Sequence, residues 1–145
     1  MPTLEDAIAL AVQAHRGQVD RAGQPYILHP LRVMLRLQGE IAQIVGVLHD
    51  VVEDSDLTLD DLRQMGYPEV VIRALDAVTR RDGESYEAFV ERSAAHPLGR
   101  QVKLADLEDN MDIRRFSGDL GEKDLARLNR YRRAWMRIMA EMARS

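Results

Sequence analysis

Residues 48–54 read Leu-His-Asp-Val-Val-Glu-Asp, and this stretch is the most informative feature of the chain. It continues an apolar run of helical periodicity that starts near Ile41. His49 and Asp50 stand side by side at the end of that run, and Glu53 and Asp54 follow one helical turn later. Burying an unpaired charge is costly unless a partner or a metal ion compensates it. The stretch therefore predicts a site for a divalent cation inside a helical fold.

If this helix continues through residue 54, its polar side chains share one arc of the helical wheel, at roughly 100° per residue, and its apolar side chains share the opposite arc. Ala42 and Gly46 fall on the polar arc, where their small size would leave room for an ion or a substrate. The competing interpretation is an amphipathic helix whose polar face meets water. Such a face usually carries lysine and glutamate, so the His-Asp pair beside small residues favours the metal site.

The composition bounds the class of protein. The chain has 145 residues, enough for a single domain over residues 1–145 with a real core. It has no cysteine, so a metal would be held by histidine, carboxylate or amide groups, which suit Mn, Mg, Fe or Zn better than copper. A net charge of −4 is not typical of a general nucleic-acid binder. Without a signal-peptide pattern or a long apolar run, we expect a cytoplasmic protein with no membrane partner.

The hydrophobic periodicity is helical almost throughout, and no segment has a convincing strand pattern. Capping signals begin two of the helices, where Thr3 is followed by Asp6 and Thr58 by Asp61. Glycine and proline mark most of the helix ends. The expected helices cover residues 4–15, 30–38, 41–54, 59–65, 68–79, 85–95, 98–115 and 122–144. The sequence therefore predicts an all-α, bundle-like domain.

The other histidines have less specific surroundings. His29 lies beside Pro30 at a loop-to-helix junction, where it can cap the helix, pack in the core or bind a metal. His15 continues the apolar face of the first helix, so we expect a buried structural histidine. His96 precedes Pro97 in a loop, and we expect it to be exposed.

A second acidic segment reads Lys-Leu-Ala-Asp-Leu-Glu-Asp-Asn over residues 103–110. Asp106 and Asn110 are four residues apart and share a helix face, with Lys103 one turn earlier. Glu108 and Asp109 point elsewhere, and we expect both to be solvated. Taken alone, this pattern is also common on helix surfaces.

Four segments together resemble one family. They are Ala14-His15-Arg16-Gly17-Gln18, Gly23-Gln24-Pro25-Tyr26-Ile27-Leu28-His29-Pro30, residues 48–54, and Val102-Lys103-Leu104-Ala105-Asp106 with Asn110. In this order and at this spacing they resemble the HD-domain metallohydrolases, and within them the RelA/SpoT-type (p)ppGpp hydrolases. The resemblance covers about residues 4–115 and implies a helical HD-domain bundle. The chain has no room for the nucleotide-synthesising domain of long family members, so it resembles a stand-alone small alarmone hydrolase.

The resemblance also implies a metal site and a reaction. One Mn²⁺ ion, or another first-row metal, would be held by His29, His49, Asp50 and Asp106. Two imidazoles and two carboxylates fix such an ion while leaving positions for water and a phosphate oxygen, and the ion lowers the pKa of its water. Glu53 and Asp54 would position and deprotonate the attacking water. The implied reaction removes the 3′-pyrophosphate of (p)ppGpp and yields GDP or GTP with pyrophosphate.

The substrate contacts that the resemblance implies are Arg21, Asn110 and Tyr131. Family members often have two adjacent basic residues near the guanine and its phosphates, whereas here Asp20 precedes Arg21. Many members have threonine three residues after the asparagine, where this chain has Ile113. For Tyr131, in the last helix, core packing is the competing interpretation. These departures leave the preference for the base open.

Three alternatives to an alarmone hydrolase stay open. The same chemistry could act on another phosphorylated nucleotide, such as a deoxynucleotide or a nicotinamide dinucleotide phosphate. The chain could instead be a nucleotide-binding regulatory module without turnover, although the presence of every expected ligand argues against this. A structural helical adaptor would require the ligand positions to be dispersed in space. The last helix carries Trp135, Met136, Ile138, Met139 and Met142, which indicate packing, in part at a subunit interface, so the sequence also allows a homo-oligomer.

Overall fold

The computed structural model describes residues 1–145. It contains nine α-helices, one short 3₁₀-helix and no strand, so the all-α prediction is confirmed. The one β-type pairing is an isolated bridge between Val19 and Pro25 in the loop after the first helix. The elements are α1 (Leu4–His15), α2 (Leu28–Leu35), α3 (Glu40–Leu48), α4 (Val51–Asp54), α5 (Leu59–Gln64), α6 (Glu69–Ala77), α7 (Tyr86–Ala95), α8 (Pro97–Asn110), η1 (Ile113–Arg115) and α9 (Glu122–Arg144).

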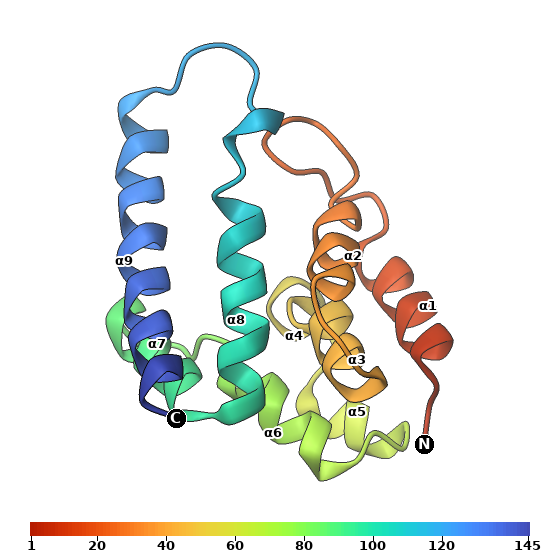
Figure 1. Cartoon of the computed structure of the whole chain (residues 1–145). Helices are drawn as coiled ribbons and strands as arrows, with labels where there is room; N and C mark the ends of the chain where they lie inside the picture. Colours follow the sequence, from red (N-terminus) through yellow and green to blue (C-terminus); the bar gives the residue numbers. More distant parts are fainter.

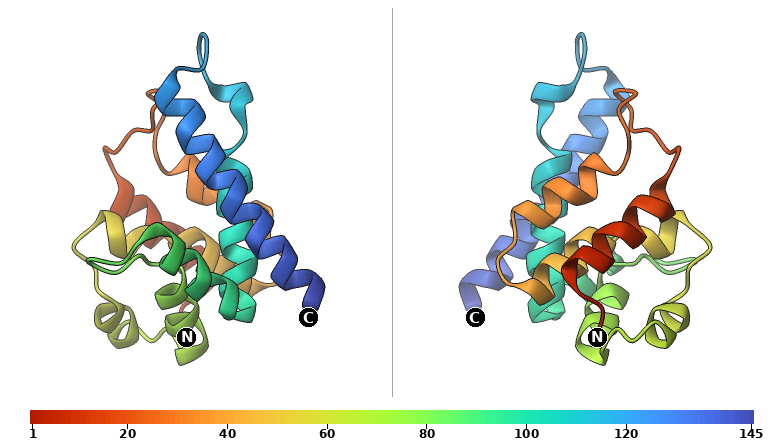
Figure 2. Two further views of the ribbon diagram at one scale, coloured as in Figure 1. Left: turned by 90° about the vertical axis from the view of Figure 1, so that its left-hand side faces the viewer. Right: turned by 90° about the vertical axis from the view of Figure 1, so that its right-hand side faces the viewer.

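The helices form two groups on either side of α8. Figure 1 shows α8 and α9 side by side and antiparallel, and α7 packs against both of them. On the other side of α8, α2 and α3 pack together, and α1 packs against α3. The two views of Figure 2 show α9 on one face of the molecule and α1 on the opposite face. Helix α8 is therefore the central element of the fold.

Two hydrophobic clusters hold this arrangement together. The larger one contains 20 buried residues, mainly from α1 to α6, and includes the fully buried Ile44 and Leu48 of α3. The smaller one joins α7, α8 and α9. Helix α8 contributes Val102 and Ala105 to the larger cluster and Leu107 to the smaller one. Because α8 is anchored on both sides, its polar residues are held in place against α2 and α3.

The predicted capping signals form as expected. The Thr3 hydroxyl accepts from the Asp6 N–H at 3.1 Å, and the Asp6 carboxylate accepts from the Thr3 N–H at 2.9 Å. The same reciprocal pair of bonds joins Thr58 and Asp61 at the start of α5. Each pair satisfies backbone donors that the first turn of a helix leaves unpaired. The last helix covers 122–144, as the sequence predicts.

The third predicted helix, over 41–54, is wrong in one respect. Helix α3 ends at Leu48 and α4 starts at Val51, so His49 and Asp50 lie in a break between two helices. The break has a local cause, because the His49 ring donates through Nδ1 to the Gly46 carbonyl at 2.6 Å. The backbone of Asp50 then turns to φ −102° and ψ −1°. Residues 48–54 therefore do not share one helical wheel.

The small residues of α3 also serve a different purpose from the predicted one. A Cβ atom added to Gly46 would lie 2.6 Å from Leu37 Cδ1 and 3.4 Å from the Cα of Met34. Ala42 belongs to the larger hydrophobic cluster. Gly46 therefore allows α2 and α3 to approach each other, and Ala42 packs in the core, so the predicted role of these residues in leaving room for an ion is wrong.

Other boundaries differ from the prediction by a few residues. Helix α2 begins at Leu28, before Pro30, and ends at Leu35. A proline is tolerated in a first helical turn because its missing N–H would be unpaired there. Helix α8 ends at Asn110, and the separate η1 turn follows where a helix through residue 115 was expected.

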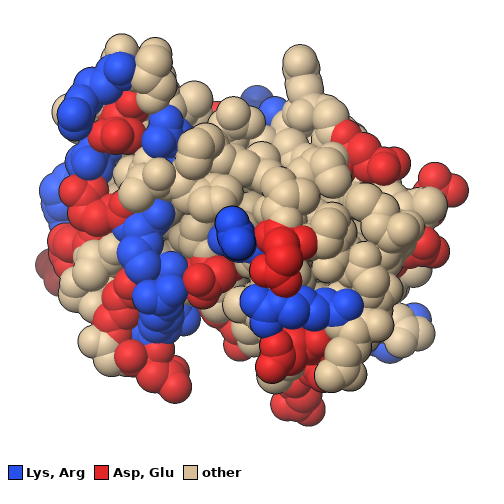
Figure 3. Space-filling view, turned by 90° about the horizontal axis from the view of Figure 1, so that it is seen from below, with Lys and Arg blue, Asp and Glu red and all other residues tan.

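None of the helices combines the length and the apolarity that a membrane crossing needs. On the face seen in Figure 3, basic and acidic side chains are interspersed, which accords with the net charge of −4.

An ion pair joins the turn before α7 to that helix and makes stability depend on pH. Arg92 donates through Nε to Glu84 Oε2 at 2.6 Å and through Nη2 to Glu84 Oε1 at 2.9 Å. These hydrogen bonds lower the pKa of Glu84 to about 2. A carboxyl group whose pKa falls on folding stabilises the folded state above its unfolded pKa, and this contribution is lost as the pH falls through the folded pKa.

Glu84→Gln is therefore expected to lower the melting temperature at neutral pH. The difference in melting temperature between wild type and variant should shrink as the pH falls from the ordinary pKa of 4.5 toward about 2. At that pH, Glu84 becomes protonated in the folded protein as well as in the unfolded protein. Thermal unfolding followed by circular dichroism at several pH values checks this, with Asp82→Asn in the same turn as the control. A difference in melting temperature that stays constant over this pH range would contradict the role of the Glu84–Arg92 ion pair.

Candidate metal centre

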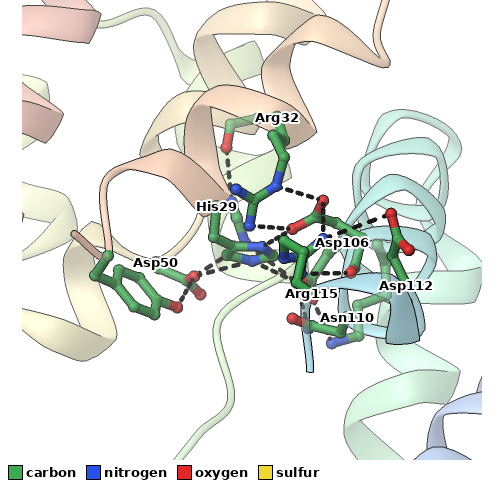
Figure 4. A network of polar contacts seen from close by, with 12 residues as sticks. His29, Arg32, Asp50, Asp106, Asn110, Asp112 and Arg115 are labelled. Atoms are coloured by element: carbon green, nitrogen blue, oxygen red, sulfur yellow. Dashed lines mark hydrogen bonds and ion pairs between the residues drawn. The ribbon is translucent and has the colours of Figure 1, made fainter. Parts of the chain in front are cut away.

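Four predicted site residues meet where α2, α8 and the break between α3 and α4 come together. His29 lies on α2, Asp106 on α8, and His49 and Asp50 in the break. Asp106 Oδ1 lies 3.0 Å from His29 Nε2 and 3.4 Å from His49 Nε2. Asp50 Oδ2 lies 3.6 Å from His29 Nε2 and 3.1 Å from His49 Nε2. Figure 4 shows His29 between Asp50 and Asp106. Two imidazole nitrogens and two carboxylates thus face a common centre.

This donor set fits a divalent metal ion, and His49 gives the clearest sign. Its side chain is 2% exposed, and its Nδ1 donates to the Gly46 carbonyl, so Nε2 is the ring nitrogen that remains available to a proton or a metal ion. Nε2 is buried and forms no hydrogen bond, although two carboxylates lie within 3.4 Å. Buried polar atoms without a partner are rare. A cation between this nitrogen and the two carboxylates would satisfy all three groups.

The charges of the cluster also favour the binding of a cation. Burial disfavours a charged His49, but the negative charges of Asp50 and Asp106 outweigh burial and raise the pKa of His49 well above its ordinary value. Burial also opposes ionisation of Asp50, and His49 nevertheless lowers the pKa of Asp50 to about 2. The site therefore attracts positive charge, which protons supply in the absence of a metal. Metal binding would release those protons.

Asp106 is held by two neighbours on its own helix. Lys103 Nζ donates to Asp106 Oδ2 at 3.0 Å, and Asn110 Nδ2 donates to Asp106 Oδ1 at 3.0 Å. Burial raises the pKa of the Asp106 carboxyl, but the Lys103 ammonium and the two histidines hold it well below its usual range. Lys103 is itself buried, and its ammonium lies 4.6 Å from the centre of the Phe89 ring. Asp106 is therefore a fixed, ionised carboxylate.

Two residues that contact this cluster were not predicted from the sequence as part of the site. The Tyr26 hydroxyl donates to Asp50 Oδ2 at 2.6 Å, and burial together with Asp50 raises the pKa of Tyr26. Asp109, which was expected to be solvated, is fully buried and contacts His29 Nδ1 at 2.7 Å. A local signal was available only for Asp109, which follows Asp106 by three residues on the same helix, about one turn away. Tyr26 lies before α2 and meets Asp50 across 24 residues of sequence, so a local pattern does not contain this contact.

The two predicted catalytic carboxylates lie on α4, directly after the break. Glu53 and Asp54 are both exposed. Glu53 Oε1 accepts from the Arg80 N–H at 2.6 Å, and the Asp54 carbonyl accepts from Gln18 Nε2 at 2.8 Å. Partial burial and the nearby charge of Asp50 raise the pKa of both carboxyl groups. A carboxylate with a raised pKa near a metal site is suited to accept a proton.

The three predicted substrate contacts differ in how they relate to the cluster. Asn110 joins it directly through its bond to Asp106. Arg21 is exposed in the loop after α1, where its guanidinium lies 3.9 Å from Asp124 at the start of α9. Tyr131 on α9 packs against the smaller hydrophobic cluster, with the Arg130 guanidinium 5.8 Å from its ring centre. The structure thus brings only Asn110 into contact with the proposed ligands.

The two remaining histidines have structural surroundings. His15 is 2% exposed, and its Nδ1 lies 2.9 Å from Gln18 Oε1, in line with the predicted buried histidine. The prediction of an exposed His96 is wrong. This side chain is half-buried and accepts from the Gly99 N–H at 2.9 Å, so it caps the N-terminus of α8.

Comparison with known proteins finds no family model that matches the chain. A GTP pyrophosphokinase of Streptomyces coelicolor is 36% identical over 126 residues, which are 78% of this chain and 15% of that protein. A guanosine-3′,5′-bis(diphosphate) 3′-pyrophosphohydrolase of Aquifex aeolicus is 30% identical over 121 residues, which are 74% of this chain and 17% of that protein. The chain therefore spans about a sixth of the length of the curated relatives it matches.

A solved structure shares the fold. It is that of a metazoan ortholog of SpoT that is described as hydrolysing ppGpp. The two superpose with a TM-score of 0.77 and 21% sequence identity, over 93% of this chain and 84% of the other. On this sequence similarity and this fold, the chain belongs to the RelA/SpoT-type family of HD-domain proteins.

Proposed function

We propose that the chain removes the 3′-pyrophosphate from guanosine alarmones, (p)ppGpp, with the help of one Mn²⁺ ion. The observation that carries the metal-dependent chemistry is the buried, unpartnered Nε2 of His49, which faces the carboxylates of Asp50 and Asp106. The substrate is supported by the relatives, some of which are named guanosine-3′,5′-bis(diphosphate) 3′-pyrophosphohydrolases and others pyrophosphokinases. The combination of His29, His49, Asp50 and Asp106 with the nearby carboxylates of Glu53 and Asp54 supports hydrolysis as the activity proposed here.

In this proposal, the ion is held by His29, His49, Asp50 and Asp106. It would offset the charge that develops on the phosphate and lower the pKa of a water molecule. Glu53, with its raised pKa, would take a proton from the attacking water, and Asp54 would orient that water. The water oxygen would bond to the phosphorus next to ribose O3′, the bond from that phosphorus to O3′ would break, and O3′ would leave with a proton. The products are GDP or GTP and pyrophosphate.

The proposed substrate contacts follow from the free groups of the same residues. Asn110 donates one N–H to Asp106, which leaves its amide oxygen able to accept from a ribose hydroxyl. The Arg21 side chain is 59% exposed and is held only by a 3.9 Å contact with Asp124, so it is free to reach a phosphate. Tyr131 would provide a ring against which the nucleotide could lie.

We further propose that the chain forms a single domain over 1–145 and is cytoplasmic. Its partner would be a free nucleotide rather than a nucleic acid or a membrane. A homo-oligomer would bury the exposed Met136 and Met139.

One observation favours a second candidate substrate, another phosphorylated nucleotide such as a deoxynucleotide or a nicotinamide dinucleotide phosphate. Where the family often has two basic residues, Asp20 uses its side chain within the loop. Its Oδ1 accepts from the Ala22 N–H at 2.9 Å and from the Gln24 N–H at 3.0 Å. Only Arg21 then offers positive charge at this position, which weakens the case for a guanosine with two pyrophosphate groups.

A substrate panel distinguishes the two candidates. Metal-stripped protein would be given Mn²⁺ and then ppGpp, dGTP or NADPH, and pyrophosphate and phosphate release would be measured, with Asp106→Asn as the blank. We expect stoichiometric GDP and pyrophosphate from ppGpp, and none in the blank. Phosphate release from NADPH or turnover of dGTP alone would favour the second candidate. Binding of Mn²⁺ without turnover of any nucleotide would favour a regulatory module.

A further inference from the structure

The buried carboxylate of Asp109 lies behind the proposed metal site and is not one of its ligands. Its side chain is 0% exposed, and Oδ2 lies 2.7 Å from Nδ1 of His29. The other ring nitrogen of His29, Nε2, faces Asp50 and Asp106. His29 therefore stands between Asp109 on one side and the common centre of the ligands on the other.

Two arginines from different elements hold Asp109. Arg32, one turn after His29 on α2, donates through Nε to Oδ1 at 2.8 Å and through Nη2 to Oδ2 at 3.1 Å. Arg115 of η1 reaches Oδ1 at 3.5 Å and donates to the Asp109 carbonyl at 3.0 Å. Figure 4 shows Arg32 and Arg115 converging on this region from α2 and η1. A carboxylate that accepts from both nitrogens of one guanidinium and is approached by a second has a fixed orientation.

The Asp109 carboxylate decides the proton position on His29. Both of its oxygens accept hydrogen bonds from the Arg32 guanidinium, the pairing that an ionised carboxylate makes with arginine. An ionised carboxylate has only acceptor atoms, so the proton in the bond to His29 belongs to Nδ1. A neutral imidazole with its proton on Nδ1 carries its lone pair on Nε2, which is the atom that faces the metal site.

We propose that Asp109 is a positioning residue that fixes His29 in the tautomer and orientation required to bind the metal ion through Nε2. Arg32 and Arg115 complete this arrangement, because their guanidinium groups hold the Asp109 carboxylate in its orientation. The inference rests on the metal site of the proposed function but not on its substrate. Residues that orient a metal-binding histidine in this way typically change metal affinity by 10- to 100-fold when they are altered.

The first test variant is Asp109→Asn, because an amide preserves the shape of the carboxylate but has only one acceptor oxygen. If that oxygen occupies the Oδ1 position and accepts from Arg32 Nε, the amide N–H₂ meets His29 Nδ1. His29 must then carry its proton on Nε2, where the metal should bind. In the opposite orientation, the N–H₂ group meets the Nε–H of Arg32, and two donors face each other. Neither orientation reproduces the wild-type bonds.

Asp109→Ala is expected to affect Mn²⁺ binding less than Asp109→Asn does. It removes the carboxylate and leaves space for a water molecule, which can accept from His29 Nδ1–H and so permit the correct tautomer. Arg32 and Arg115 are each 31% exposed, so solvent can reach their guanidinium groups. We therefore expect Asp109→Asn to bind Mn²⁺ about 10- to 100-fold more weakly than wild type, and Asp109→Ala to bind it more tightly than Asp109→Asn. A residue with only a structural role would give the opposite order, because alanine creates the larger cavity.

The experiment titrates metal-free protein with Mn²⁺ and follows free Mn²⁺ by electron paramagnetic resonance, with thermal unfolding of each variant beside it. Asp112→Asn is the matched control, because Asp112 binds Arg114 and approaches Arg115 but does not contact His29. The control should keep wild-type affinity. Affinity of Asp109→Asn within about twofold of wild type, or a weaker alanine than asparagine variant, would overturn the proposal.

If neither Asp109 variant folds, Arg32→Gln tests the same arrangement through a partly exposed residue that holds Asp109. This change removes two of the bonds that orient Asp109 and is expected to weaken Mn²⁺ binding several-fold, and unchanged affinity would overturn the proposal. Because Mn²⁺ affinity is measured without nucleotide, an error in the proposed substrate does not affect the result. Failure of the wild-type protein to bind Mn²⁺ would instead refute the metal site itself.

Discussion

Replacing Asp106 with asparagine is expected to abolish Mn²⁺ binding and nucleotide hydrolysis together. Asp106 Oδ1 is the one carboxylate oxygen within 3.4 Å of both histidine Nε2 atoms, so its charge acts on both sides of the proposed site. Loss of an outer partner of a ligand already costs 10- to 100-fold in metal affinity, so loss of a charged ligand should cost more than about 100-fold. Isothermal titration with Mn²⁺ and a pyrophosphate-release assay measure the two effects.

The same change also disturbs folding, and this must be separated from metal binding. Lys103 is buried and donates to Asp106 Oδ2, so a neutral partner leaves a buried ammonium without its counter-charge. Breaking such a pair from one side costs about 3 kcal/mol. Adding Lys103→Met to Asp106→Asn should restore much of this stability without restoring metal binding. Glu108→Gln is the control on the same helix, because Glu108 contacts Trp135 outside the cluster. Wild-type Mn²⁺ affinity in Asp106→Asn would contradict the assigned site.

The sequence predicts which residues cluster at the proposed metal site better than it predicts their surroundings. His49 and Asp50 were recognisable because a helical core has no use for a His-Asp pair, and the structure does bring them together with His29 and Asp106. Their place in a break between α3 and α4 was not predictable, since the apolar pattern runs through residues 41–52 without a glycine or proline stop after Gly46. The hydrogen bond from the His49 ring to the Gly46 carbonyl is a local side-chain effect that periodicity does not contain.

Asp109 and Tyr26 show why supporting residues are harder to predict than ligands. On the wheel of α8, Asp109 follows Glu108 and looks like one more solvated charge. Its burial depends on Arg32, which is distant in sequence and is brought near only when α2 packs against α8. Tyr26 likewise meets Asp50 across a separation of 24 residues. By contrast, the caps at Thr3 and Thr58 depend on neighbours three residues away, and a local pattern is sufficient to predict them.

Replacing Glu53 with glutamine is expected to leave the metal bound and to lower turnover by at least about 100-fold, the low end of general acid–base catalysis. The structure makes this substitution unusually selective. Glu53 Oε1 accepts from the Arg80 N–H at 2.6 Å, and the amide oxygen of glutamine can make the same bond, so α4 should keep its place. The other end of the side chain changes from an oxygen that can take a proton to an N–H₂ group that cannot.

A steady-state assay with ppGpp and an Mn²⁺ titration on the same preparation test this prediction. Asp56→Asn, an exposed carboxylate just after α4, serves as the matched control and should retain wild-type turnover. Mn²⁺ affinity should be equal in all three proteins, because Glu53 contacts none of the proposed ligands. A fall in Mn²⁺ affinity would move Glu53 into the ligand set. Unchanged turnover would remove Glu53 as the base and leave Asp54, whose pKa is also raised by partial burial and by Asp50, as the carboxylate that takes the proton. Asp54→Asn should then show the loss that Glu53→Gln does not.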